Sequence, residues 1–292
     1  LRETLAEIVA MHKQGTYDLP EVEEKETQAV QRNLTPWERV QLSRDKARPV
    51  GAEYIEELFT DFMEFHGDRN YGDDKAIIGG IAKFHGKPVT VIVQEKGTNT
   101  KENIAHNFGM PMPDGYRKAL RLMKQAEKFN RPVICFVDTP GAFCGLEAEE
   151  RGQGEAIARN LFEMSNLQVP ILSVVIGEGG SGGALAMATS DEVWLLENSI
   201  YSILSPEGFA SILWKDSSRA KEAAGVMKLT ADRLLKAGIV ERVIPEPENF
   251  NLETFTEVTD PMDDYISIFL KKYGAMTKEE LTEKRYDRFR RM

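Results

Sequence analysis

Cysteine is scarce in this sequence, and histidine is confined to its first part. The two cysteines, Cys135 and Cys144, are too few for a disulfide framework or a four-thiolate zinc site, and they follow no metal-ligand spacing. All four histidines lie at or before His106. We therefore expect no metal site in this chain, and a catalytic site that needs a histidine late in the sequence is excluded.

Long apolar runs are also missing. No run reaches the roughly 18 consecutive apolar residues of a membrane helix. Residues 1–14 alternate charged and apolar positions and lack the basic start and apolar middle of a secretory signal. These absences predict a cytoplasmic protein that does not bind or cross a membrane.

Positive charge is in deficit. The chain has 37 Lys and Arg residues against 47 Asp and Glu residues, which gives a net charge of −10 and a pI near 5.1. This balance opposes general attraction to nucleic acid or to anionic lipid. We expect no specific nucleic acid binding, and any anionic ligand must be held by local groups.

The composition is that of a globular protein. Of the 292 residues, 41% are hydrophobic and 29% are charged, which is enough to bury a core. No low-complexity linker divides the chain, so we expect a helical N-terminal extension (1–48), one core domain (49–250) and a helical C-terminal tail (251–292). The segment Thr35-Pro36-Trp37-Glu38 has the form of a capping box and predicts a helix to about residue 45.

Apolar periodicity changes along the next part of the chain. Residues 54–65 are amphipathic with a helical period and predict a helix. Residues 76–84 and 88–94 are apolar and rich in β-branched side chains, which predicts two strands joined by the tight connection His85-Gly86-Lys87.

A unit of apolar strand, glycine-containing loop and helix then recurs three times. The strands are expected at 89–93, 133–137 and 171–176, and the helices at 116–129, 155–167 and 181–188. Further strands are expected at 193–196, 202–204 and 239–244, with helices at 206–214 and 230–236 and a polar helical tail from Pro261. Strands that are apolar on both faces imply a sheet covered on both sides, so the predicted fold class is α/β.

The densest chemical signal is the run Gly177-Glu178-Gly179-Gly180-Ser181-Gly182-Gly183, which follows a buried strand and opens a helix. Glycines allow backbone N–H groups to approach a ligand, and a helix N-terminus adds partial positive charge. Such a segment can hold an anion.

Four interpretations of this run remain open. Gly177, Gly179 and Gly182 fit a dinucleotide fingerprint with Glu197 about 20 residues on, although the helix is short for that role. Ser181 fits a nucleophile motif, but no histidine follows it as an α/β-hydrolase requires. The run also suits an oxyanion hole made of backbone donors, or simply a tight turn with close packing.

Other segments could contribute to the same site. Asp138-Thr139-Pro140-Gly141-Ala142 ends the preceding strand and could line the same cleft, because sites in parallel sheets gather at the carboxyl ends of strands. The acidic residues 147–150 are more typical of the first turn of a helix than of acid–base catalysis.

A basic stripe lies on the helix expected at 116–129. Its members, at helical spacing, are Arg117, Arg121, Lys124 and Lys128. A solvated helix face is the plainer interpretation of the stripe. Docking of an acidic partner or a phosphate is the functional one.

Six segments carry a resemblance to a known family. They are Asn107-Phe108-Gly109-Met110-Pro111, residues 115–123, Asp138-Thr139-Pro140-Gly141-Ala142, residues 148–153, residues 177–184, and Ser205-Pro206-Glu207-Gly208 with Ile212-Leu213-Trp214-Lys215. In this order, over residues 34–247, they closely resemble the alpha subunits of bacterial acetyl-CoA carboxylase carboxyltransferases.

The resemblance implies a crotonase-type spiral of repeated ββα units and a biotin-dependent carboxyltransferase. Such an enzyme moves a carboxyl group from carboxybiotin, held on a separate biotin carboxyl carrier protein, to acetyl-CoA and gives malonyl-CoA. This is the first step of fatty acid biosynthesis, within an ATP-dependent complex. The resemblance also implies an α2β2 heterotetramer, active only with a beta subunit that carries the zinc ribbon.

Carried onto this sequence, the resemblance assigns Gly182 and Gly183 as backbone N–H donors to the biotin ureido oxygen, with Gly179 and Gly180 shaping the turn. Substrate contacts are expected at Gly179 and Gly180 and also at Gly141, Ala142 and Phe143. The chain departs from the family pattern at Phe143-Cys144 and at Glu248-Asn249-Phe250-Asn251. A carboxyltransferase or decarboxylase subunit for another acyl-CoA, or a non-catalytic regulatory paralogue, are therefore the alternatives.

Overall fold

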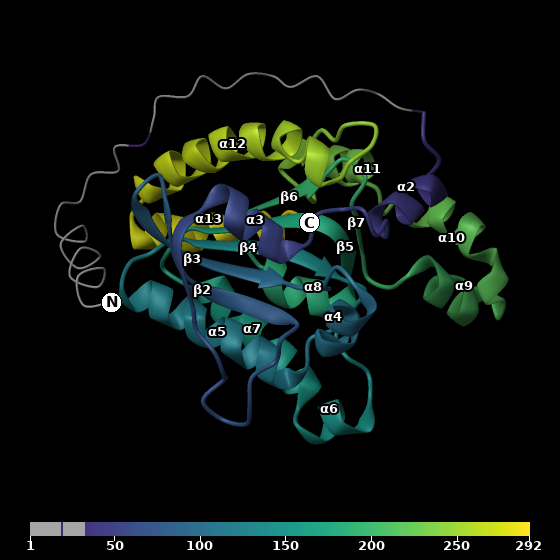
Figure 1. The fold of residues 1–292 in the computed structure, drawn as a ribbon, viewed down its shortest axis with the longest axis horizontal. Coiled ribbons are helices and arrows are strands. Elements are labelled where there is room, and N and C mark those ends of the chain that lie inside the picture. The colour runs from purple at the N-terminus through teal and green to yellow at the C-terminus, as the bar shows by residue number, and fades with distance from the viewer. Residues whose placement is uncertain (1–18, 20–32) are drawn as a thin grey trace.

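The structure, a computed structural model, describes residue 19 and residues 33–292 of the chain. These residues form one mixed sheet with helices on both faces (Figure 1). The strands are β1 (Thr60–Glu64), β2 (Ile77–Phe84), β3 (Lys87–Gln94), β4 (Val133–Thr139), β5 (Ile171–Gly180), β6 (Glu192–Leu196), β7 (Ile200–Ser202) and β8 (Arg242–Ile244). Their order is β1-β2-β3-β4-β5-β6-β8, and β7 pairs with the end of β5. The predicted α/β class is confirmed.

Helices precede the sheet, connect its strands and follow it. They are α2 (Pro36–Ser43), α3 (Gly51–Leu58), α4 (Thr100–Ala105), α5 (Pro113–Lys128), α6 (Leu146–Glu150), α7 (Gln153–Asn166), α8 (Ser181–Ala188), α9 (Pro206–Trp214), α10 (Ala220–Met227), α11 (Ala231–Lys236), α12 (Thr256–Gly274) and α13 (Lys278–Arg290). In the described part of the chain, no helix is both long and apolar enough to cross a membrane.

The connections bring three strand ends to one edge of the sheet. β1, β2 and β3 are antiparallel neighbours, whereas β3, β4, β5, β6 and β8 run parallel. Helices α5, α7 and α8 provide the crossovers between the parallel strands. The carboxyl ends of β3, β4 and β5 therefore lie side by side, and this is where sites form in parallel sheets.

The predicted strands around His85 are confirmed as a hairpin. β2 and β3 pair in a continuous antiparallel register, from Phe84 opposite Lys87 to Ile77 opposite Gln94. His85 and Gly86, the two turn residues, have φ values of 45° and 76°. Positive φ at both positions matches the right-handed twist of the flanking strands.

The core is divided by the sheet into two layers. Alternate residues of the central strands pack against α3 and α12 on one face, as Phe136 does. The residues between them pack against α5, α7 and α8 on the other face, as Val137 does. Figure 1 shows α12 and α5 on opposite sides of the sheet. Apolar side chains on both faces explain why these strands are continuous apolar runs in the sequence.

The terminal helices agree with the predicted helical character of both ends. Thr35 caps α2, and Glu38 completes the capping box. The rest of the predicted N-terminal extension, apart from residues 19 and 33–48, lies outside the described residues. α12 is less polar than its sequence suggested, because Ile266, Phe269 and Leu270 are buried in the core. The division at 48 and 250 stays a prediction.

Several predicted boundaries need correction. The helix expected at 54–65 ends at Leu58, and its second half is strand β1. Phe59 is already extended, and Asp61 takes a left-handed φ of 54° beside a shift in the β1–β2 register. Pairing with β2 thus outweighed a helical period that extended over only about three turns. β7 begins two residues early, β8 begins three residues late, and α4 and α10 were not predicted.

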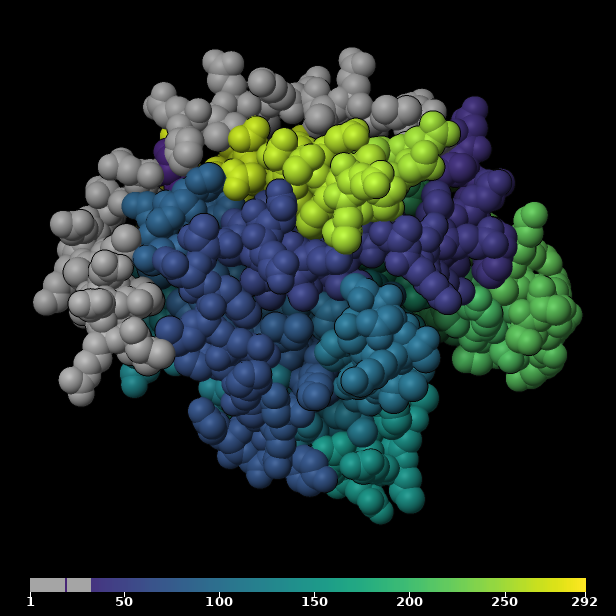
Figure 2. Space-filling view, in the orientation of Figure 1, coloured from purple at the N-terminus to yellow at the C-terminus, as the bar shows by residue number. Residues whose placement is uncertain are grey.

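Helices α9 and α10 project from the body of the molecule, on the right of both views (Figures 1 and 2). Large apolar side chains on this arm are more than half exposed: Ile212, Leu213 and Val226. Exposed apolar side chains gathered on one projecting element are typical of an interaction surface.

Candidate active site

The glycine run is not a loop in the structure. Residues Gly177 to Gly180 are the end of β5, and α8 begins at Ser181 without a connecting residue. Ser181 makes the turn with a φ of 54°, a left-handed conformation that is uncommon outside glycine. β7 pairs with this end of β5, opposite Glu178, Gly179 and Gly180. The chain is therefore held as a strand up to the first residue of the helix.

Close packing accounts for the glycines at the end of β5. A Cβ atom on Gly179 would lie 2.8 Å from the ring of Tyr201. On Gly180 it would overlap the backbone of Pro140, and on Gly177 the carboxylate of Asp138. The structure thus supports the close-packing interpretation for these three positions, which does not conflict with a ligand site one turn further on.

Gly182 and Gly183 face different neighbours. A Cβ atom on Gly182 would lie 3.5 Å from Ile157 Cγ2 of α7, an ordinary contact. A Cβ atom on Gly183 would overlap the backbone N of Ala142 and lie 2.7 Å from the Tyr116 hydroxyl. Gly183 is therefore the residue at which α8 meets the loop after β4, a distinction that the sequence pattern does not contain.

Backbone N–H groups without a hydrogen-bond acceptor among the described residues lie where α8 meets the loop after β4. α8 has no side-chain hydrogen bond at its N-cap, Gly180. Within residues 33–292, the backbone N–H of Ala142 makes no hydrogen bond, whereas its neighbours Gly141 and Phe143 donate to Thr139 Oγ1 and Pro111 O. Free N–H groups at a helix N-terminus favour an anion. The arrangement can stabilise negative charge without a titrating side chain.

Buried amide side chains support this junction. Gln94 Nε2 donates to the Gly183 carbonyl oxygen at 3.0 Å. Gln153 Nε2 donates to the carbonyl oxygens of Pro111 and Phe143, each at 2.9 Å. Neither glutamine was expected at the site from the sequence, although Gln153 lies in one of the segments that carry the resemblance; the partner of Gln94 is 89 positions away. Gln94, the last residue of β3, could have been noticed from its position at the end of an apolar strand.

Tyr116 lies behind Gly183. Its side chain is fully buried, and its hydroxyl has no hydrogen-bond partner among the described residues. Burial raises the pKa of Tyr116 well above its ordinary value. The hydroxyl therefore stays protonated and occupies the space that a side chain at position 183 would need.

A charged cluster stands at the same edge of the sheet. Lys96, just after β3, contacts Asp138 of β4 at 2.6 Å and Glu178 of β5 at 3.3 Å. Burial lowers the pKa of Lys96, but these carboxylates outweigh it and the pKa is raised. Arg44, the residue that follows α2, contacts Glu178 at 2.7 Å and also Glu207 of α9 at 2.7 Å. Asp138 was expected at this site from its sequence motif, whereas the cations Lys96, its own partner, and Arg44, a partner of Glu178, were not.

Two of the other interpretations of the glycine run lose support. Ser181 has no hydrogen bond to a histidine in the described part of the chain, where His66 and His85 contact Asp73 and Asp263 instead. Glu197 is buried and accepts a hydrogen bond from the Glu246 backbone N–H at 3.1 Å, so it is not available to a ribose. The described residues thus form neither a serine triad nor a dinucleotide site around this run.

The basic stripe on α5 is largely occupied by internal contacts. Arg117 pairs with Asp68 at 2.7 Å, Arg121 donates to the Gly67 carbonyl oxygen at 3.0 Å, and Lys124 pairs with Glu163 at 2.7 Å. The fourth member, Lys128, lies over the Phe129 ring. Docking of a partner or a phosphate on this stripe stays a prediction. The acidic residues Glu147 and Glu149 do occupy the first turn of α6.

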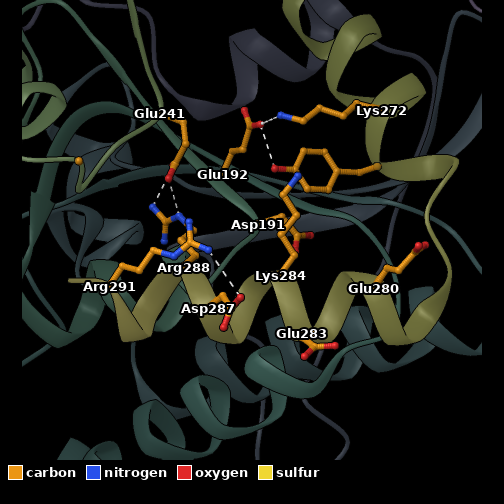
Figure 3. A pocket seen from close by; sticks show the side chains of 12 residues that line it. Asp191, Glu192, Glu241, Lys272, Glu280, Glu283, Lys284, Asp287, Arg288 and Arg291 are labelled. Carbon is orange, nitrogen blue, oxygen red and sulfur yellow. Dashed lines mark hydrogen bonds and ion pairs between the residues drawn. The ribbon is translucent and has the colours of Figure 1, made fainter.

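A cavity of about 560 Å³ lies elsewhere, beside the first residues of β6 (Figure 3). Its charges are mostly paired with one another. Glu192 contacts Lys272 at 2.8 Å, and Arg288 contacts Glu241 at 2.7 Å. Because β5 and β6 are parallel, this end of β6 is at the opposite edge of the sheet from α8. The cavity is separate from the candidate site.

Comparisons with known proteins point in one direction. The family described as acetyl co-enzyme A carboxylase carboxyltransferase-like matches residues 2–292. The chain is 62% identical over 259 residues to the acetyl-coenzyme A carboxylase carboxyl transferase subunit alpha of Clostridium acetobutylicum, covering 89% of this chain and 94% of that protein. It is 49% identical over 292 residues to the carboxyl transferase subunits beta/alpha of Clostridium tetani, covering 99% of this chain and 51% of that protein.

A solved structure shows the same fold at lower sequence identity. The transcarboxylase 12S crystal structure, with methylmalonyl-coenzyme A and methylmalonic acid bound, matches with a TM-score of 0.62 and 19% identity. The match covers 76% of this chain and 40% of that chain. The expected crotonase-type arrangement of ββα units is thereby confirmed.

Proposed function

Because this chain belongs to the acetyl-CoA carboxylase carboxyltransferase family, as an alpha subunit, we propose that it transfers a carboxyl group from carboxybiotin to acetyl-CoA at the β5–α8 junction. The reaction gives malonyl-CoA. The observation that carries the proposal is the meeting of Gly183 with the free N–H of Ala142 at the N-terminus of α8.

Each group at the junction has a task in this proposal. The backbone N–H groups of Gly182 and Gly183 donate to an oxygen that becomes negative during transfer, and the helix dipole adds to their effect. Donors of this kind are fixed before the reaction, so that no reorganisation is needed when charge develops. Loss of one such donor costs about 3 to 4 kcal/mol of barrier.

Biotin fits this junction by its chemistry. Carboxybiotin, delivered on a separate carrier protein, supplies the carboxyl group, and its ureido oxygen carries the developing charge. The unused donors at α8 and Ala142 match a ligand that presents an oxygen acceptor rather than a cation. Gly141, Ala142 and Phe143 form the adjoining loop, which Gln153 ties down through the Phe143 carbonyl oxygen. We place the substrate contacts on these three residues.

A beta subunit completes the enzyme in this proposal. The Clostridium tetani relative carries beta and alpha subunits in one protein, and this chain spans about half of it. The projecting arm α9–α10 exposes Ile212 and Leu213, which is expected of a chain that works with a partner. We further propose an α2β2 assembly, with zinc held in the beta subunit, acting in the cytoplasm in fatty acid synthesis as part of an ATP-dependent complex.

The test is co-expression with the beta subunit from the same source, followed by the reverse assay. Malonyl-CoA-dependent carboxylation of biocytin is measured for each subunit and for the pair. Activity only in the pair supports the proposal. If a stable pair has no activity with malonyl-CoA but is active with another short acyl-CoA, that compound replaces malonyl-CoA as the assigned substrate. A stable pair without activity on any of them would indicate a regulatory paralogue.

A further inference from the structure

The pairing of β4 with β5 is interrupted next to the candidate site. Val137 is opposite Val175, but the next pair is Thr139 opposite Gly179. Asp138 alone thus faces the three residues between Val175 and Gly179. Because regular pairing is lost there, other contacts must fix the last residues of β5, from which α8 starts.

Asp138 supplies one of these contacts. Its Oδ1 atom accepts a hydrogen bond from the Glu178 backbone N–H at 2.8 Å. The carboxylate lies so close to Gly177 that any Cβ atom there would overlap it. Asp138 therefore holds the end of β5 directly, from the strand beside it.

Lys96 in turn holds Asp138. Its ammonium group contacts Asp138 Oδ1 at 2.6 Å, the same oxygen that accepts the Glu178 N–H. The side chain of Lys96 is only 21% exposed, and its stem runs along Gly109, where a Cβ atom would lie 3.3 Å from Lys96 Cε. Glu178 has a second cation in Arg44, whereas Lys96 is the one cation paired with Asp138 among the described residues.

We propose that Lys96 is a positioning residue for the reaction, which holds Asp138 and Glu178 so that the end of β5 aims the first N–H groups of α8. The proposal rests on the proposed function of that site. Lys96 does not touch the reacting groups in this assignment. Its effect passes through Asp138 and the Glu178 peptide, and without it two carboxylates would face each other at an interrupted pairing.

The test compares Lys96→Met with Lys96→Arg and a matched control in the complex with the beta subunit. Lys118→Met is the control, since Lys118 is fully buried and contacts Asp73 at 2.5 Å but belongs to α5. We expect Lys96→Met to lower kcat of the reverse reaction by about tenfold or more, with KM for malonyl-CoA nearly unchanged. Lys96→Arg should regain part of kcat, and Lys118→Met should lower the melting temperature without lowering kcat.

Amide hydrogen exchange over residues 177–184 provides a readout that does not depend on turnover. We expect faster exchange there in Lys96→Met and not in Lys118→Met. If the wild-type pair shows no turnover, the proposed function fails, while the exchange data still decide the role of Lys96. Unchanged kcat together with unchanged exchange in Lys96→Met would overturn the inference. If that variant does not fold, the double variant Lys96→Met with Asp138→Asn replaces it, with the same expectations.

Discussion

Arg285 and Asp191, which are 94 residues apart in the chain, form two hydrogen bonds of 2.9 Å in the interior of the protein. Both side chains are completely buried. The same guanidinium donates to the carbonyl oxygens of Met164, Leu167 and Val169. One residue of α13 thus ties together the end of α7, the segment before β5 and the segment before β6.

Replacement of Arg285 by methionine should destabilise the protein strongly. The variant leaves the Asp191 carboxylate buried without its cation, and breaking such a pair costs about 3 to 5 kcal/mol. Urea unfolding of the two proteins measures this difference. Arg291→Met is the matched control, because Arg291 is 81% exposed and lies 3.6 Å from Asp287. Equal losses in both variants would contradict the role assigned to the buried pair.

Substitutions at the two adjacent glycines of α8 should have opposite outcomes. Gly183→Val fills the space at Ala142 and the Tyr116 hydroxyl, so we expect carboxyl transfer to fall by about 100-fold or more. Gly182→Ala adds only an ordinary contact with Ile157 and should keep most of the activity. The reverse assay with the beta subunit measures both. Comparable loss in the two variants would place the critical donor elsewhere.

Ser181→Ala should change the turnover number little, because Ser181 is exposed and no histidine in the described residues contacts it. Ser181→Gly should raise stability by about 1 kcal/mol, since glycine accepts the left-handed φ of 54° without strain. Thermal unfolding and the reverse assay check both statements. Complete loss of activity in a correctly assembled Ser181→Ala complex would restore the serine nucleophile as a hypothesis.

Glu95 should make stability depend on pH in an unusual direction. Burial raises the pKa of Glu95 from 4.5 to about 7, although the backbone N–H groups of Ala52 and Gly97 lower it in part. The pKa of Glu95 is therefore higher in the folded state than in the unfolded state. The stability that this group contributes is fully present below about pH 4.5 and is lost as the pH rises through about 7.

Glu95→Gln removes this titration. The free energy of unfolding of the variant, relative to that of the wild type, should rise by about 3 kcal/mol between pH 4.5 and pH 8. Any effect of the amide that does not depend on pH cancels in this comparison. Urea unfolding at pH 5 and pH 8 measures the change in the difference. Parallel pH profiles for the two proteins would show that Glu95 titrates normally in the folded state.

The sequence predicted the elements whose pattern is local. Helices cover both faces of β4, so every residue of this strand is buried. The strand therefore appears in the sequence as a continuous apolar run, Val133 to Val137, which is easy to identify. The capping box at Thr35 and Glu38 is likewise contained in four residues. Where two patterns competed over a short stretch, as around Phe59, strand pairing with β2 decided the outcome.

The candidate site was only partly predictable, because its contacts are long-range. The glycine run indicated the helix N-terminus correctly, but Gly182 and Gly183 are equivalent in sequence and differ only in what faces them. Gln94 reaches Gly183 across 89 positions, and Lys96 reaches Glu178 across 82. A single sequence does not predict which distant residues form such pairs. It does predict that each of these residues lies at or just after the end of an apolar strand.

The direct passage from Gly180 of β5 into Ser181 of α8 also limits how this segment can change in length. Each residue in an α-helix turns the chain by about 100°, so one inserted residue at the junction would rotate α8 by more than a quarter of a turn. A side chain would then enter the space between Ala142 and Tyr116 that Gly183 leaves open. Libraries that vary this region should therefore tolerate exchanges of residue type far better than insertions or deletions.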